Sequence, residues 1–244
     1  ARVQVVPLVA GLVASLAIAP ALLRGLVAGR HVRTNYRGDA LPTPFGVLLP
    51  LALILAAALA AAVALAADDP EPLPVALGFV LGVAFLGLLD DQFTTESRGL
   101  RGHLRAVLRG ELSTGAIKAI GTAALALAVV APGVVLDATS LGDGALAFAI
   151  LVLATNLFNL LDLRPGRTLK AFVLVAAACL PFLDAGARAD LGLFVGPILV
   201  AGLYDLRERA VPGDRGSTVI GAVAGLCLVA PAGGSPAALA PISG

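Results

Sequence analysis

The sequence predicts an all-α protein, a bundle of about eight transmembrane helices that forms one integral membrane domain over residues 1–244. The first observation behind this prediction is composition. Of the 244 residues, 59% are hydrophobic and only 14% are charged, which leaves too little polar surface to cover a water-soluble globule. The second is that apolar stretches recur along the whole chain, and a helix of about 20 residues spans the ~30 Å of hydrocarbon in a bilayer.

Each apolar stretch is expected to form one helix. The predicted spans are residues 4–27, 44–67, 73–89, 115–136, 145–161, 171–184, 191–204 and 217–235. The stretches at 171–184 and 191–204 are short, so we leave open that they lie partly inside the bundle. The first stretch is long and is followed by arginines instead of a small-residue cleavage site, which favours a true span over a signal peptide.

Basic residues concentrate in the loops that lie inside if the N-terminus lies outside. These inner loops contain Arg30, Arg33, Arg37, Arg98, Arg101, Arg105, Arg109, Arg164, Arg167, Lys170, Arg207, Arg209 and Arg215. The outer connections then hold only Arg188. Because cytoplasmic loops of membrane proteins carry an excess of Lys and Arg, we predict a multi-pass protein of the cell (plasma) membrane with its N-terminus outside.

Aspartates lie at the predicted cytoplasmic ends of several spans. Asp90 and Asp91 end one apolar run, Asp162 ends another, and Asp214 opens the last. Carboxylates so close to a bilayer are costly and indicate a functional site. Hard oxygen ligands suit Mg²⁺, and the sequence offers no cluster of Cys or His that would suit zinc. We therefore predict a membrane active site, facing the cytoplasm, in which these four candidate catalytic residues hold a divalent cation and a phosphate-bearing substrate.

The segment at 35–46 joins the first two spans and brings polar residues to the membrane surface. Asn35 and Arg37 are candidates for binding either lipid headgroups or a substrate phosphate. Thr43 is expected to cap the next helix, with Pro44 in its first turn. An ordinary connecting loop explains much of the same pattern.

The Asp90–Asp91 pair ends a helix, where carboxylates oppose the helix dipole unless a cation offsets them. Neighbouring helical residues diverge by about 100°, so the two side chains cannot both reach one ion from a regular helix. Lys118 lies about one turn inside the next span. It either extends to the interface or pairs with these carboxylates or a phosphate, and the sequence leaves both alternatives open.

A polar stripe closes the fifth predicted span. Asn156, Asn159 and Asp162 follow one another at steps of three residues, which places them on one helix face. Amides commonly form hydrogen bonds between transmembrane helices, and this is the alternative to a substrate-binding role. Arg164 and Arg167 follow directly and are candidates for meeting a diphosphate or an anionic lipid.

Residues 213–217 open the last predicted span. Gly213 permits a tight backbone and a close approach of a ligand. Ser217 or Thr218 is expected to cap a helix whose N-terminus favours anions. A capping turn alone would explain this string, but its position places Asp214 at the same depth as the other aspartates.

In their order along the chain, these segments resemble the polyprenyl-phosphate N-acetylhexosamine-1-phosphate transferase family, which includes the phospho-N-acetylmuramoyl-pentapeptide transferases. The resemblance covers roughly residues 30–220 and includes a Pro-Thr-x-x-Gly string that ends at Gly46. It implies transfer of a sugar phosphate from a UDP-sugar to a polyprenyl phosphate, with release of UMP and a requirement for Mg²⁺. It also implies that Asp162 and Asp214 are ion and nucleotide-site residues and that Asp90 is a base or an acceptor-positioning group.

The sequence departs from the family after Asp162. The family continues its stripe as Asp-Gly-x-Asp-Gly, whereas Leu163-Arg164-Pro165-Gly166-Arg167 follows Asp162 here, so a second acid is missing and two arginines are gained. The family's His-rich loop has no counterpart, and the chain stops about two spans earlier. We therefore expect a single-ion site in which one of these arginines neutralises part of the charge.

The resemblance implies a polyprenyl phosphate lipid, a UDP-sugar and the membrane as partners, no nucleic acid, and a role in cell-envelope glycan synthesis such as that of peptidoglycan. A homodimer is left open. A non-catalytic membrane scaffold or lipid-binding relative is the main alternative, because one acid is missing. A transporter is a weaker alternative, since it would favour sites at the membrane midplane and inverted repeats, which the sequence lacks.

Overall fold

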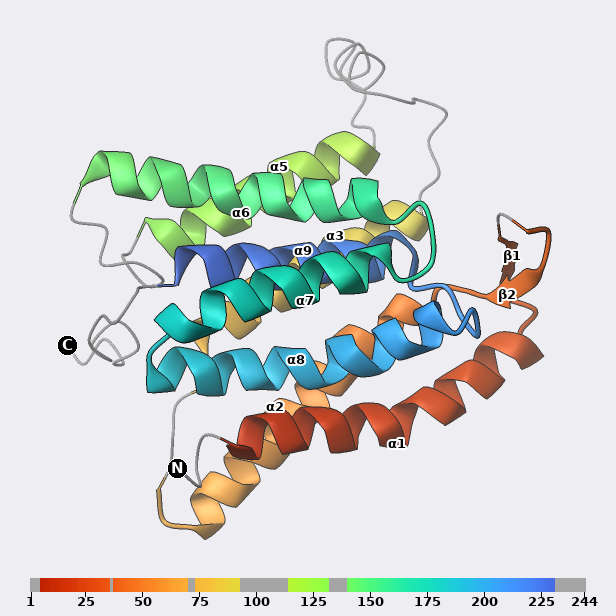
Figure 1. Ribbon diagram of the computed structural model, residues 1–244, viewed down its shortest axis with the longest axis horizontal. Coiled ribbons are helices and arrows are strands. Elements are labelled where there is room, and N and C mark those ends of the chain that lie inside the picture. Colours follow the sequence, from red (N-terminus) through yellow and green to blue (C-terminus); the bar gives the residue numbers. More distant parts are fainter. Residues whose placement is uncertain (1–4, 36, 70–72, 93–113, 132–139, 231–244) are drawn as a thin grey trace.

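A computed structural model describes residues 5–35, 37–69, 73–92, 114–131 and 140–230, without the side chains of Asp91, Gln92 and Thr114. The described chain is mainly helical (Figure 1). In chain order its elements are α1 (Val6–Ala28), β1 (Val32–Thr34), β2 (Ala40–Pro42), the 3-10 turn η2 (Phe45–Val47), α2 (Leu48–Ala66), α3 (Val75–Gln92), α5 (Thr114–Val130), α6 (Leu141–Leu161), α7 (Arg167–Cys179), the 3-10 turn η3 (Leu180–Phe182), α8 (Ala185–Leu206) and α9 (Gly213–Val229).

Four of the described helices are long and apolar enough to cross a membrane: α1, the continuous helix Phe45–Ala66, α6 and α8. Val75–Asp90 and Gly115–Val130 form shorter apolar helices. Large apolar side chains point outward from the long helices, as they do in helices that face lipid; Leu16 and Leu160 are examples. Length and composition therefore indicate a helical membrane protein, whereas about eight crossings remain a prediction.

Several helices begin before the apolar stretch that predicted them. α6 starts at Leu141, where Ser140 Oγ accepts a hydrogen bond from the Asp143 backbone N–H at 3.2 Å. α8 starts at Ala185, where Asp184 Oδ1 accepts one from the Ala187 N–H at 2.7 Å. Hydropathy alone placed these starts too late, because a capped first turn forms its backbone hydrogen bonds whether or not its side chains are apolar. The predicted ends at 136 and 235 lie outside the described residues.

Helix α9 is the central helix of the described bundle. Apart from Asp214 in its first turn, every residue from Gly213 to Cys227 is buried. It packs against α6, α3 and α7 and against the turn η2. Glycines bring the backbones together, since a Cβ at Gly221 would lie 2.7 Å from the Ala154 carbonyl oxygen of α6. Close packing through small residues is typical of membrane helices, and here it joins α9 to α6.

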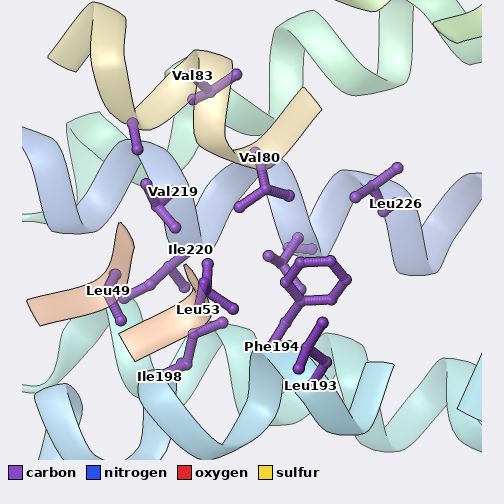
Figure 2. Packing of buried hydrophobic residues seen from close by; sticks show 14 of the residues in the cluster. Leu49, Leu53, Val80, Val83, Leu193, Phe194, Ile198, Val219, Ile220 and Leu226 are labelled. Atoms are coloured by element: carbon purple, nitrogen blue, oxygen red, sulfur yellow. The ribbon is translucent and has the colours of Figure 1, made fainter. Parts of the chain in front are cut away.

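The apolar core fills the space between α9, α2, α3 and α8 (Figure 2). Side chains from these four helices interdigitate, and the labelled members are Leu49, Leu53, Val80, Val83, Leu193, Phe194, Ile198, Val219, Ile220 and Leu226. On the other side of α8, helix α1 packs closely through glycine, because a Cβ at Gly196 would lie 2.6 Å from the Leu12 backbone nitrogen.

A short β-hairpin corrects the all-α prediction locally. β1 and β2 pair antiparallel, with Arg33 opposite Leu41. The turn between them depends on Asn35, whose Oδ1 accepts hydrogen bonds from the backbone N–H groups of Arg37 and Asp39, both at 2.8 Å. Gly38 adopts φ +93°, a left-handed conformation that suits glycine. The asparagine and glycine of this loop therefore build a hairpin turn.

Successive helices run in opposite directions, so alternate connections lie at the same end of the bundle (Figure 1). One end carries the hairpin, the end of α3, the start of α5, the α6–α7 turn and the α8–α9 connection. The predicted site residues belong to these segments or to the helix turns next to them. We call this end of the bundle the polar end.

Candidate functional site

The site begins where the last turn of α6 meets the first turn of α9. Ser217 Oγ donates a hydrogen bond to Asn159 Oδ1 at 3.1 Å. Asp162 is the C-terminal cap residue of α6, and Asp214 lies in the first turn of α9. The third and fourth segments of the sequence analysis are thus in direct contact, although 58 positions separate Asn159 from Ser217.

Asp162, at this junction, has a carboxyl group with a strongly raised pKa. Burial, and then the nearby carboxylates of Asp205 and Asp214, together raise the pKa of its carboxyl from 3.8 to about 7. The Arg33 guanidinium of β1 acts in the opposite direction without cancelling the shift. Asp205 and Asp214 are therefore each close enough to repel the Asp162 carboxylate, and a cation bound at Asp162 would relieve that repulsion.

A second polar contact joins α3 to α5 at the same end. Lys118 Nζ lies 3.4 Å from Asp90 Oδ2, and the two side chains are only 11% and 19% exposed. Of the two alternatives left open for Lys118, the structure has pairing with a carboxylate. A Cβ at Gly87 would lie 3.1 Å from the Arg215 Cα, so the end of α3 lies against the start of α9. The backbone of Asp91 belongs to α3, but its side chain lies outside the described residues.

The hairpin is attached to the α8–α9 connection. Glu208 Oε2 accepts a hydrogen bond from Asn35 Nδ2 at 3.1 Å, and Glu208 Oε1 lies 3.3 Å from Arg37 Nη1. Backbone hydrogen bonds continue the contact, because the Val211 N–H donates to the Pro42 carbonyl at 2.9 Å. Asn35 and Arg37, predicted to bind substrate, therefore have a structural contact of their own.

Two predicted helix caps are wrong. The turn η2 has Pro44 as its N-cap residue and no capping side chain, so Thr43 does not cap it. Helix α9 likewise begins with no capping side chain. The Thr218 hydroxyl instead donates backward to the Asp214 carbonyl, and Ser217 Oγ, which donates to Asn159, lies beside the carbonyl oxygens of Gly213 and Asp214. These residues lie one turn inside α9, because the helix starts earlier than hydropathy predicted, and so they cannot cap it.

The polar stripe of α6 divides into two parts. Asn159 faces α9, as its bond to Ser217 shows. Asn156 is exposed, and its Nδ2 donates to the Val152 carbonyl of its own helix at 2.9 Å. The structure therefore does not bring Asn156 to α9. A step of three residues turns a helix by about 60° less than a full turn, which is enough to place these two amides on different sides.

The connection after α6 holds both predicted arginines. Arg164 and Arg167 are exposed, and the turn ends at Gly166, which has φ +73° and is the N-cap residue of α7. Gly213 also adopts a positive φ, +70°, at the start of α9. Glycine is suited to both positions because a side chain is strained in this conformation. The two glycines set the entry angles of two helices at the site.

Three residues of this region were missed as site residues by sequence reasoning: Arg33, Asp205 and Glu208. Asp205 carries the signal that identified Asp162, an acid directly after an apolar run, here the predicted span 191–204. The same criterion, applied to every apolar run, would have identified Asp205 as a candidate site residue. Arg33 and Glu208 have no comparable signal, because their importance depends on contacts between distant segments.

The carboxylate ligands that this site offers can be compared with the ligands that Mg²⁺ usually takes in proteins. Within the part of the chain that the structure describes, no group of three or more His, Cys, Asp or Glu side chains could hold a metal ion. Mg²⁺ usually binds through one or two carboxylates and substrate phosphates, and it keeps several waters. Asp162 and Asp214, which repel each other, suit an ion held in this shared way. They do not suit a zinc site closed by protein ligands alone.

No protein-family model matches this chain, and no curated protein matches it. The class of protein is defined by the fold: a helical protein with four described helices long and apolar enough to cross a membrane. Carboxylates, amides and a buried lysine gather at one end of it.

Proposed function

We propose that this protein transfers a sugar-1-phosphate from a UDP-N-acetylhexosamine-type donor to a polyprenyl phosphate at the cytoplasmic face of the plasma membrane, with release of UMP. One observation carries the proposal. The Ser217–Asn159 hydrogen bond joins the end of α6, which carries Asp162, to the first turn of α9, which carries Asp214, and burial, Asp205 and Asp214 raise the pKa of Asp162. Such a pair of carboxylates favours a divalent cation and the phosphates that accompany it.

Residues of this chain could neutralise part of the negative charge on two anionic substrates that would otherwise repel each other. An oxygen of the lipid phosphate would form a bond to the sugar-linked phosphorus, and the bond from that phosphorus to the bridging oxygen of UMP would break. Asp162 and Asp214 would hold Mg²⁺, which neutralises charge on the diphosphate when bound. A lipid phosphate is largely dianionic near pH 7, so positioning matters more than a strong general base.

The pair of Asp90 and Lys118 suits the acceptor side of this reaction. Lys118 lies largely buried between α3 and α5, and its ammonium contacts the carboxylate. In that position Asp90 would orient the ammonium group, and Lys118 would attract the lipid phosphate. Arg164 and Arg167, exposed in the adjacent turn, would contribute positive charge toward the donor diphosphate.

The distribution of basic residues supports the cytoplasmic side. Described arginines and lysines gather at the polar end, in the hairpin, the α6–α7 turn and the α8–α9 connection, whereas Arg188 lies in the first turn of α8 at the other end. This asymmetry agrees with the positive-inside rule. A transporter would instead favour polar residues at the membrane midplane.

The test uses the full chain in nanodiscs with a polyprenyl phosphate and a panel of UDP-N-acetylhexosamines, and it measures UMP release and sugar-labelled lipid. We expect transfer that requires Mg²⁺ or Mn²⁺ and falls by at least about a hundredfold in Asp162→Asn and Asp214→Asn. Asp69→Asn, an exposed carboxylate after α2, is the matched control and should keep full activity.

Full transfer in EDTA, or in either site variant, would contradict the proposed mechanism. If no UDP-sugar in the panel gives transfer, the proposal fails, and the result favours a non-catalytic membrane scaffold or lipid-binding protein.

A further inference from the structure

Asp205, in the last turn of α8, is a buried carboxylate that none of the roles above uses. It is 6% exposed. Its Oδ2 accepts a hydrogen bond from the Gly166 backbone N–H at 2.7 Å. The two residues are 39 positions apart, so this bond fixes the α6–α7 turn to the end of α8.

The fit around Gly166 is close. Gly166 has φ +73°, and a Cβ at this position would lie 2.5 Å from Leu206 Cδ1. Helix α7 has no capping side chain of its own. The Asp205 carboxylate therefore acts at the N-terminus of α7 as a capping side chain would, but from another helix.

A hydrogen bond alone does not require a charged group at this position. An asparagine could accept the same bond, and it would avoid burying a carboxylate beside others, which is costly. Asp205 nevertheless accepts its hydrogen bond from Gly166, which is only four residues after Asp162 in the same turn, so its carboxylate lies near that of Asp162. Its negative charge thus acts on a residue that the proposed function assigns to cation binding.

We propose that Asp205 is a positioning residue with two separable effects on the candidate site. Through its hydrogen bond it holds the turn at 163–166, which begins next to Asp162 and ends at α7. Through its charge it strengthens the attraction of a divalent cation to Asp162 and Asp214. The second effect rests on the proposed function only in assigning a cation to these two carboxylates, because it does not depend on the transfer reaction.

Two substitutions separate the effects. Asp205→Asn keeps an acceptor for the Gly166 N–H and removes the charge, whereas Asp205→Ala removes both. Hydrogen exchange of peptides that cover 163–170 reports the turn, and titration with Mn²⁺ followed by electron paramagnetic resonance reports the cation. Both measurements use the full chain in nanodiscs and need no enzymatic activity.

Helix α8 supplies a matched control at its other end. Asp184 Oδ1 accepts a hydrogen bond from the Ala187 N–H, also at 2.7 Å, far from the polar end. Asp184→Asn and Asp184→Ala should leave Mn²⁺ affinity unchanged.

We expect Asp205→Asn to weaken Mn²⁺ binding by about tenfold and to keep the wild-type exchange rate over 163–170. Asp205→Ala should weaken Mn²⁺ binding at least as much and should also exchange faster in this segment. If Asp205→Ala does not fold, the Mn²⁺ affinity of Asp205→Asn still decides the charge effect.

Wild-type Mn²⁺ affinity in Asp205→Asn would overturn the charge effect, and wild-type exchange in a folded Asp205→Ala would overturn the positioning effect. A wild-type protein that binds Mn²⁺ but transfers no sugar phosphate would defeat the proposed function and leave the role of Asp205 standing. A wild-type protein that binds no Mn²⁺ would overturn the charge effect together with the cation site.

Discussion

Asn35 and Glu208 are 173 positions apart in the chain, yet the side-chain amide of Asn35 lies 3.1 Å from the Glu208 carboxylate. Through this contact the hairpin between α1 and the next span is held against the connection between α8 and α9. Asn35 therefore has two structural tasks, since its Oδ1 also forms the hairpin turn.

The first prediction concerns this attachment. Glu208→Ala should increase hydrogen exchange in the hairpin, because it removes both the Asn35 hydrogen bond and the Arg37 ion pair. Arg37→Ala should have a smaller effect, since its side chain is 60% exposed and exposed ion pairs contribute only ~0.2–1 kcal/mol. Equal exchange in Glu208→Ala and the wild type would mean that the backbone bonds alone hold the hairpin.

A second prediction concerns the hydrogen bond between α6 and α9. Ser217→Ala should lower the free energy of unfolding by about 1 kcal/mol, because it leaves Asn159 without its donor. Ser15→Ala is the control, since the Ser15 hydroxyl only donates to the Gly11 carbonyl of its own helix. Circular dichroism melts in detergent provide the measurement. Additive effects in the Ser217→Ala and Asn159→Ala double variant would show that the two side chains do not interact.

A third prediction concerns pH. The folded protein binds a proton at Asp162 more tightly than the unfolded chain does, because the pKa of Asp162 is raised from 3.8 to about 7. The stability from this group is complete below about pH 4 and is lost as pH rises toward 7. Asp162→Asn resembles the protonated form, so without divalent ions it should melt at a higher temperature than the wild type at pH 8.

The same comparison at about pH 3, below the unfolded pKa of 3.8, should show almost no difference. Mg²⁺ at pH 8 should raise the melting temperature of the wild type and leave that of Asp162→Asn nearly unchanged. The prediction would be contradicted if the melting temperature of the wild type changed with neither pH nor Mg²⁺ and equalled that of Asp162→Asn under every condition. Circular dichroism is suitable here because the chain contains no Trp for fluorescence.

A fourth prediction compares two glycines. A Cβ at Gly46 would lie 2.5 Å from both the Gly216 nitrogen and the Pro212 carbonyl oxygen, and neither backbone atom can move independently. Gly46→Ala should therefore destabilise the protein by at least ~1–3 kcal/mol. Gly25, inside α1, has nothing within 4 Å of its Cβ position, so Gly25→Ala should be neutral or stabilising by ~0.5–1 kcal/mol. Melting temperatures of the two variants that shift in the same direction would contradict this packing.

Local sequence signals predicted the parts of the molecule that depend on one helix at a time. Apolar runs located the described helices, and Asp162 was placed correctly because an acid that ends such a run marks the end of the helix. The same signal was available for Asp205 and was not used. The close contact of Asn159 with Ser217 depends on which faces of α6 and α9 meet, and no spacing within either segment determines this.

The hairpin was missed for a different reason. β1 and β2 have three residues each, which is too short for an alternating pattern to stand out. Their pairing is supported by Glu208, a residue from the far end of the chain, so the sequence around 35–46 alone suggested a ligand-binding loop. Polar residues at a membrane surface have similar composition whether they bind substrate or one another.

The central position of α9 has a consequence for biogenesis. All its described neighbours, from η2 to α8, precede it in the chain and so leave the ribosome before it does. Until α9 is made, Gly46, Gly87 and the Asn159 amide have no partner helix to contact. Before α9 is synthesised, the earlier helices therefore lack their central packing partner. Interruption of synthesis before residue 213 should leave a loosely packed, protease-sensitive intermediate.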